Sequence, residues 1–326
     1  MNIRHNLCFY IAVFLLLLSR VSAAIAITAD ELANTIEKME SAIIDISLEY
    51  EWFNDPPWTL EELQDITNKK VKVAVNKDIP KYKFSAARLS ANREPNNQNL
   101  PLFDRLLLEE SVTLLNEHGA WHSIVKETYD GKIAKRLLIG GFPQSVTNGE
   151  IRKSKNSMLP LNLTPIGFSV LRLSASKVTE ETPLSAMLRR KEFVHIDNTI
   201  QKINGFNTIS VDLLTEWNKQ IFMHIYFSVD HGYTPVKYEY IRVTKTGPKV
   251  AIAVEVNSLE QVAEGLWFPS SGIIRSPDDE ETNVYRATSK IVINQGLTDE
   301  HFDIKFPPGT KVYDEIKNLK YVVKSH

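Results

Sequence analysis

AIIDISLEYEW, residues Ala42–Trp52, alternates apolar and polar side chains along its whole length. Successive side chains of a strand point to opposite faces of a sheet, so the alternation predicts a long β-strand with one apolar face and one mostly polar face. We expect Asp45, Glu49 and Glu51 on the wet outer face. The apolar set expected to face inward comprises Ile44, Ile46, Leu48, Tyr50 and Trp52.

A helix is predicted immediately before this strand. Thr28 can cap its first turn and Glu31 can reach back to Thr28, which is the capping-box pattern. Leu32, Ile36 and Met39 then recur at helical spacing. The mature chain is therefore expected to begin with an amphipathic helix that leads into the long strand.

The first residues have the layout of a secretory signal peptide. A short basic start that includes Arg4 precedes the apolar run Phe9–Leu18, and small residues follow it. The run is short for a bilayer span, which takes about 20 residues, although an uncleaved anchor helix is the alternative. We expect residues 1–26 to be the signal, with cleavage near Ala23 or Ala26. Residues 27–326 then form one domain with insertions, periplasmic or otherwise exported.

Most of the remaining chain is predicted to be β-strand. Residues Tyr129-Asp130-Gly131 join two strand candidates and form the best local hairpin signal. Leu100–Asn116 is predicted to be a helix from its apolar positions, and Pro183–Arg190 a short helix with Pro at its first turn. Turn signals recur at regular spacing, which predicts one antiparallel meander with too many strands for a flat sheet. The expected fold class is α+β, mostly β, with a strongly curved antiparallel sheet.

Composition and motifs point away from several functions. The only cysteine, Cys8, lies in the predicted signal, and removing the signal's two arginines leaves 36 basic against 40 acidic residues, a formal net charge of −4. That balance gives no electrostatic reason to bind nucleic acid. The sequence has no phosphate-binding glycine loop, nucleophile elbow or paired-histidine zinc helix. We therefore expect no catalytic residue, metal or cofactor, and no membrane-spanning segment in the mature chain.

The placement of aromatic side chains on predicted strands is the unusual feature of this sequence. In Ile221–Phe227, Met223 and Ile225 point one way and the aromatic set that includes Phe222 and Tyr226 points the other. Such a strand is either covered on both faces or lines a cavity on one of them. The candidate ligand-binding residues are Ile44, Ile46, Leu48, Tyr50, Trp52, Trp121, Phe222 and Tyr226.

The order of these elements resembles the LolA/LolB-like superfamily of outer-membrane lipoprotein-sorting proteins. The resemblance rests on the export signal, the capped helix and long strand, and three later segments: Phe227–Val236, Glu264–Pro269 and Phe306–Asp314. It implies a half-open antiparallel barrel with helices covering an apolar concave face. The lid-locking arginine of the family matches no single residue here, and the nearby candidates are Lys83 and Arg88.

The resemblance implies an exported, non-enzymatic carrier or binder of lipid-like ligands, such as the acyl chains of lipoproteins or other lipids. Burial of each acyl CH₂ contributes about 0.8 kcal/mol, so such a ligand needs no polar motif. The alternative is a periplasmic sensor or interaction module of RseB type that binds an envelope protein or polymer. A hydrolase of envelope polymers is a third class, although no convergent acid–base or nucleophile set is visible.

Overall fold

The structure is a computed structural model. It describes residues 26–57, 59, 61–62, 75–88, 103, 105–116, 119–130, 132–140, 146–153, 183–216, 218–276 and 282–325. Residues 1–25 of the predicted signal peptide, the Gly131 position of the hairpin and all of 154–182 lie outside these residues.

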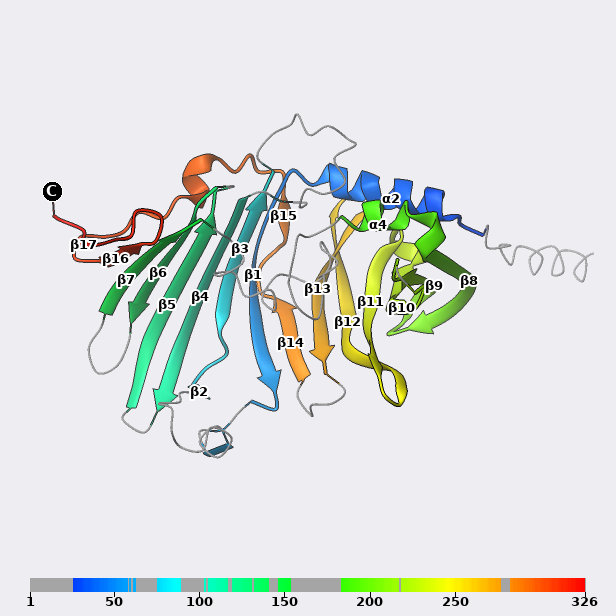
Figure 1. Cartoon of the computed structure of the whole chain (residues 1–326), viewed down its shortest axis with the longest axis horizontal. Coiled ribbons are helices and arrows are strands. Elements are labelled where there is room, and N and C mark those ends of the chain that lie inside the picture. Colours follow the sequence, from blue (N-terminus) through cyan, green and yellow to red (C-terminus); the bar gives the residue numbers. More distant parts are fainter. Residues whose placement is uncertain are drawn as a thin grey trace, which may run out of the picture.

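One large open sheet forms most of the molecule, and strand β1 (Asp45–Asp55) lies at its centre (Figure 1). On one side of β1 the strand pairings run outward through the right arm of Figure 1. Its strands, in spatial order, are β14 (Thr282–Ala287), β13 (Leu266–Arg275), β12 (Gly247–Ala263), β11 (Thr234–Thr244), β10 (Ile221–Ser228), β9 (Phe206–Leu214) and β8 (Val194–Ile203).

The left arm extends from the other side of β1. Its strands, in spatial order, are β3 (Lys81–Ala87), β4 (Arg105–Asn116), β5 (Gly119–Tyr129), β6 (Ala134–Gly140), β7 (Val146–Arg152), β16 (Lys311–Asp314) and β17 (Leu319–Val322). Short strands β2 (Val75–Asn76) and β15 (Val292–Ile293) pair with β4 and β1. The pairs are antiparallel except for β7 with β16, which are parallel, so the sheet is mixed. The predicted β-rich, strongly curved sheet is confirmed.

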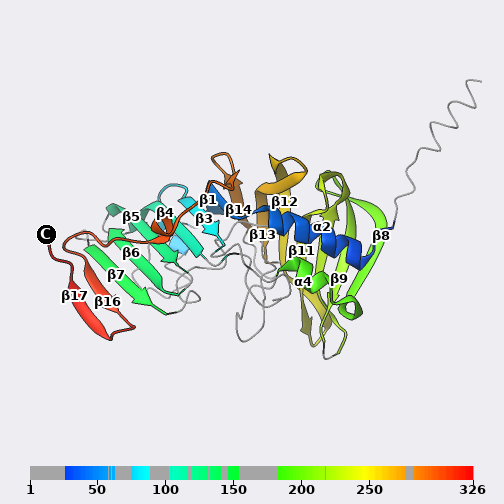
Figure 2. The ribbon, with the colours of Figure 1, turned by 90° about the horizontal axis from the view of Figure 1, so that it is seen from above.

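Two helices cover the right arm. Helix α2 (Ala29–Ala42) begins with the predicted capping box between Thr28 and Glu31, and α4 (Leu184–Leu188) is the predicted short helix after Pro183. Viewed from above, they lie together across the right arm (Figure 2). The apolar face of α2 belongs to the same buried cluster as the strands beneath it. The 3₁₀ turn η3 (Lys191–Phe193) leads from α4 into β8, and the turns η4 (Val229–His231) and η5 (Asp299–Phe302) connect strands.

The C-terminal segment packs on the left arm. Phe302, in η5, is buried in a second, small cluster with Ala87 and Leu107. Farther along, a Cβ on Gly149 would lie 2.8 Å from the Phe306 ring, so only glycine fits there without displacing that ring. This segment carries the chain to β16 and β17, which extend the sheet beyond β7.

The predicted helix at Leu100–Asn116 is wrong, because β4 occupies Arg105–Asn116. Leu106, Leu107 and Leu108 are all buried, so both faces of this strand are covered here and the apolar residues do not alternate. Leucine and glutamate also favour helices, but pairing with β3 and β5 on both sides overrides that local preference. Strands β7, β13, β16 and β17 were not predicted from the sequence, because β7 and β13 contain Gly or Pro and β16 and β17 are only four residues long.

Candidate ligand-binding face

The candidate site is the inner face of the sheet, which we define as the face bearing Ile46, Leu48, Tyr50 and Trp52. All four side chains are buried, with exposed fractions of 1%, 4%, 0% and 6%. Tyr50 stacks on Tyr82 of β3 with ring centroids 5.1 Å apart. It also contacts Tyr285 of β14 at 5.3 Å. The two neighbours of β1 thus enclose it in aromatic rings, and the predicted inward face is confirmed at these four positions.

Two positions of this strand differ from the prediction. Ile44 is 58% exposed and Ile43 is fully buried, so the alternation changes phase where α2 joins β1. Asp45, expected in solvent, is buried because its carboxylate accepts hydrogen bonds from the backbone N–H groups of residues 295–297 at 2.8–3.2 Å. A buried carboxylate needs such donors to offset the loss of water. Asp45 therefore anchors the segment after β15 rather than marking a wet face.

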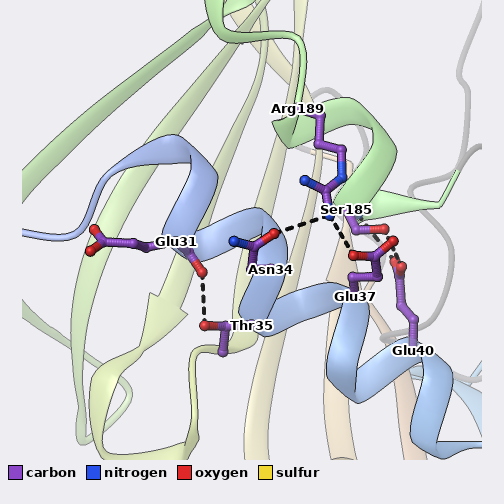
Figure 3. Close-up of polar contacts among 7 residues, drawn as sticks. All are labelled: Glu31, Asn34, Thr35, Glu37, Glu40, Ser185 and Arg189. Carbon is purple, nitrogen blue, oxygen red and sulfur yellow. Dashed lines mark hydrogen bonds and ion pairs between the residues drawn. The ribbon is translucent and has the colours of Figure 1, made fainter.

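Polar contacts hold the helices over the inner face (Figure 3). The buried Glu40 carboxylate accepts hydrogen bonds from the Ser185 hydroxyl and, at 3.2 Å, from the Ser185 backbone N–H. Arg189 donates to Asn34 at 3.1 Å and forms an ion pair with Glu37. Burial raises the pKa of Glu40 above its ordinary value, although the Ser185 hydrogen bonds act in the opposite direction. These contacts join α2 to α4, so the two helices form one cover.

A third contact ties this cover to the sheet. The Arg88 guanidinium, directly after β3, donates to the backbone carbonyl of Glu40 in the last turn of α2. Carbonyl groups in that turn have no partner within the helix, and a cation is favoured there by the helix dipole. At the other end, the Asn198 side chain accepts from the Ile27 N–H at 2.9 Å and so ties α2 to β8. Lys83, the other candidate named above, instead pairs with Glu49 at 3.3 Å on the outer face.

The inner face becomes polar along the left arm. Tyr82 donates to Glu110 of β4 at 3.1 Å, and Glu127 of β5 lies 3.0 Å from Arg136 of β6. Burial raises the pKa of Glu110, and it raises the pKa of Glu127 to about 7. Desolvation penalises a carboxylate more than these partners stabilise it. Away from the helices, the apolar face therefore ends in two carboxyl groups, the buried Glu127 and the half-buried Glu110.

A hollow lies at the C-terminal end of β1, the end farther along the chain from α2. Its volume is about 460 Å³, and its walls include Trp52, Tyr82 and Asn283. The Trp52 indole donates to the Asn283 side chain at 3.1 Å. Among the predicted ligand-binding residues, Trp52 alone lines this hollow, while Ile46, Leu48 and Tyr50 lie in the packed interior.

The remaining predicted residues do not join one site. Trp121 is half-buried on β5, several strands from β1. Tyr226 lies on the outer face of β10, where its hydroxyl donates to Glu239 at 3.3 Å, while Met223 and Ile225 of the same strand are fully buried. Phe222 is half-buried beside an irregularity in the β9–β10 pairing. The sequence pattern correctly separated the two faces of β10, but it could not show which face is the inner one.

Sequence reasoning missed the aromatic partners of β1. Tyr82, Phe84, Phe268 and Tyr285 are buried on β3, β13 and β14, far from β1 in the chain. Tyr82 and Phe84 do alternate with Lys81 and Lys83, which was a usable strand signal. The ring contacts of Tyr82 and Tyr285 with Tyr50 depend on which strands pair, and alternation does not encode the pairing.

The inner face offers apolar and aromatic area rather than reactive groups. Among the described residues there is no group of three or more His, Cys, Asp or Glu side chains placed to hold a metal ion. The closest histidine–carboxylate pair, His224 with Asp212 at 2.5 Å, joins β10 and β9 on the outer face. Across the described residues, no helix is both long enough and apolar enough to cross a membrane.

Comparisons with known proteins gave structural neighbours only. No protein-family model matches the sequence, and no curated protein matches it. A crystal structure of a DUF1329 family protein from Desulfovibrio piger is similar at 10% identity and a TM-score of 0.43, covering 84% of this chain and 95% of that one. A putative outer membrane lipoprotein-sorting protein domain from Vibrio parahaemolyticus is similar at 9% identity and a TM-score of 0.41, with the same coverage.

Proposed function

We propose that this protein is an exported, non-enzymatic carrier or binder of lipid-like ligands, whose acyl chains lie on the inner face beneath α2 and α4. One observation supports it above the others: a continuous aromatic and aliphatic face is covered by a helix pair that a small number of polar contacts attach to the sheet. Ligand binding then exchanges helix contacts for acyl contacts, and the affinity comes from the apolar area that the acyl chains bury beyond the area that the displaced helices expose.

On the right arm, which α2 and α4 cover, the inner-face residues Val211, Met223 and Ile225 are fully buried, so the cover is closed over this face. A ligand on this face must therefore displace α2 and α4. The energetic requirement is that acyl burial exceeds the loss of the helix–sheet contacts, since a ligand shifts an equilibrium only by its differential affinity for the two states.

A disulfide that holds α2 on the sheet tests this requirement. Ile27→Cys with Asn198→Cys, in a Cys8→Ser background, joins the start of α2 to β8 where the two residues already share a hydrogen bond. We expect the oxidised protein to bind a fluorescent fatty acid weakly and the reduced protein to bind it normally. The reduced protein and the single Asn198→Cys variant are the matched controls. Equal binding in both redox states would contradict a ligand beneath the helices.

Identification of the natural ligand needs the protein from its own envelope. Mass spectrometry of the purified mature chain should then reveal co-purified lipid. Reproducible absence of lipid, together with no fatty-acid binding by the reduced protein, would count against a carrier of any kind.

A second candidate, an interaction module of RseB type, is favoured by a different observation. Bulky side chains close the inner face, and exposed apolar residues lie instead at the outer edge of the left arm, with Leu319 50% and Val322 55% exposed. Exposed apolar groups at a sheet edge are a common contact for a protein partner. Crosslinking in envelope extracts distinguishes the two functions: one stoichiometric protein partner without bound lipid favours the module.

A further inference from the structure

A second hollow lies in the left arm, away from the helices. Its volume is about 540 Å³, within the range of sites for small molecules. Four adjacent strands, β6, β7, β16 and β17, form its floor and walls. We call it the edge groove, and its lining includes Arg136, Leu138, Glu150, Lys311, Tyr313 and Lys320.

The strand register places these side chains on one face. Arg136 pairs with Glu150, Glu150 with Tyr313, and Tyr313 with Lys320 across successive strands. Directly opposed residues of paired strands project to the same side of a sheet. Since Arg136 also contacts the inner-face Glu127, the edge groove is an outlying part of the inner face.

Cationic charge in the edge groove is only partly compensated. Arg136 lies 3.0 Å from Glu127, and Glu150 lies 3.0 Å from Arg152, so these two lining charges have partners. By contrast, no carboxylate within the described part of the chain lies at ion-pair distance from Lys311 or Lys320. Lys320 instead lies over the Tyr313 ring at 5.6 Å. Two ammonium groups therefore border an apolar and aromatic floor without an anion between them.

Unsatisfied buried polar atoms gather at the same place. In the described residues, Arg136 Nε, Arg152 Nε, Glu127 Oε2 and Glu150 Oε2 are buried without an aligned hydrogen bond, although ion-pair contacts hold the side chains together. Buried polar atoms are rarely left without a partner, so such a cluster calls for an additional polar group. Arg136 and Glu150 line the edge groove, and Glu127 and Arg152 are their ion-pair partners.

We propose that the edge groove binds an anionic amphiphile, with its phosphate or carboxylate head between Lys311 and Lys320 and its apolar part against Leu138, Tyr313 and Val322. The charge selects the head, because two uncompensated ammonium groups favour an anion and each can donate hydrogen bonds to it. The apolar floor selects the tail, because Val322, on the same face as Lys320, is an exposed apolar side chain that a ligand would cover. This site does not require a ligand beneath α2 and α4.

Titration calorimetry with dodecyl phosphate tests the proposal. Lys311→Gln with Lys320→Gln removes both ammonium groups and should weaken binding about tenfold or more. The matched control, Lys317→Gln with Lys324→Gln, makes the same charge change in the same C-terminal segment but outside the groove lining, and should bind like the unaltered protein. Binding should also weaken between low and high salt, since exposed charges are screened. Equal affinities of the two double variants would overturn the proposal.

Two further probes determine the ligand class and its position. Glycerol phosphate has the anionic head without the tail, and binding as tight as that of dodecyl phosphate would overturn the amphiphile and indicate a soluble anion. A dodecyl phosphate with a photoreactive tail should crosslink within residues 311–322 or β6, and crosslinks confined to α2 or β1 would overturn the edge groove as the site.

The neutral detergent dodecyl maltoside separates this proposal from the carrier function. If it binds equally to both double variants while dodecyl phosphate does not, two distinct sites are present. If neutral ligands bind and dodecyl phosphate shows no dependence on Lys311 and Lys320, the edge groove proposal fails and the carrier function stands.

Discussion

The two arms of the sheet share one inner face but are covered in different ways. The right arm is covered by α2 and α4, and its buried residues are almost all aliphatic or aromatic. The left arm has Glu110, Glu127 and Arg136 on the same face, and its edge groove is open. The comparison shows that one continuous face can provide a dry, closed surface at one end and a charged, accessible one at the other.

The largest expected effect tests whether the inner face near β1 is closed in solution. Leu48→Glu places a carboxylate where the side chain is 4% exposed and should lower the free energy of unfolding by about 3–5 kcal/mol or prevent folding. Circular dichroism melting measures this, with Glu49→Gln on the exposed side of β1 as the control. A normal melting temperature for Leu48→Glu would show that this face is hydrated, and the contrast between the arms would disappear.

The next effect concerns the contact between the two covering helices. Glu40→Ala removes the acceptor of two Ser185 hydrogen bonds and leaves the buried Ser185 N–H unsatisfied, which should cost about 2 kcal/mol in urea unfolding. Glu37→Ala removes a partly exposed ion pair with Arg189 and should cost below about 1 kcal/mol. If the two variants are equally stable, the Glu40 contact does not hold the helices together.

The Glu127 carboxyl group of the left arm should make the free energy of unfolding depend on pH. The folded-state pKa of Glu127 is about 7, above its ordinary value of 4.5, so the folded protein binds this proton more tightly than the unfolded chain does. Stability from this group is therefore present below about pH 4.5 and is lost as the pH rises toward 7.

Glu127→Gln should remove this dependence. Between pH 5 and pH 8 the unaltered protein should lose about 1–3 kcal/mol more stability than the variant. The control is Glu109→Gln, which removes a carboxylate paired with Lys126 at 3.6 Å on the outer face. This variant should lose as much stability between pH 5 and pH 8 as the unaltered protein does. Identical pH profiles for Glu127→Gln and the unaltered protein would show that the carboxyl group is solvated.

The smallest expected effects are those of substituting Arg88 and Lys83, the two basic residues that were candidates for holding α2 on the sheet. Arg88→Gln removes the charged donor to the α2 carbonyl and should destabilise by about 1–2 kcal/mol, with faster amide exchange in α2. Lys83→Gln breaks only an exposed ion pair with Glu49 and should change stability by less than about 0.5 kcal/mol. Equal exchange rates in α2 for both variants would show that Arg88 does not hold the helix.

Local sequence signals correctly predicted the elements that are determined by residues close together in the chain. The capping box set the start of α2, the alternation from Ile46 to Trp52 set the inward face of β1, and Asp130 marked the β5–β6 hairpin, where its side chain accepts from the N–H groups of residues 132 and 133. Each of these depends on residues a few positions apart, so a short window of sequence contains the necessary information.

Only the tertiary structure decided the arrangement of the candidate sites. The contact of Tyr50 with Tyr285, the burial of Asp45 against residues 295–297, and the joining of β7 to β16 all link segments more than 150 residues apart. Periodicity identifies which side chains share a face, but it does not specify which strands pair or what covers that face. The apolar face of β1 could therefore be predicted from the sequence. The contacts that hold α2 and α4 on the sheet, and the cationic edge groove, depend on long-range pairing.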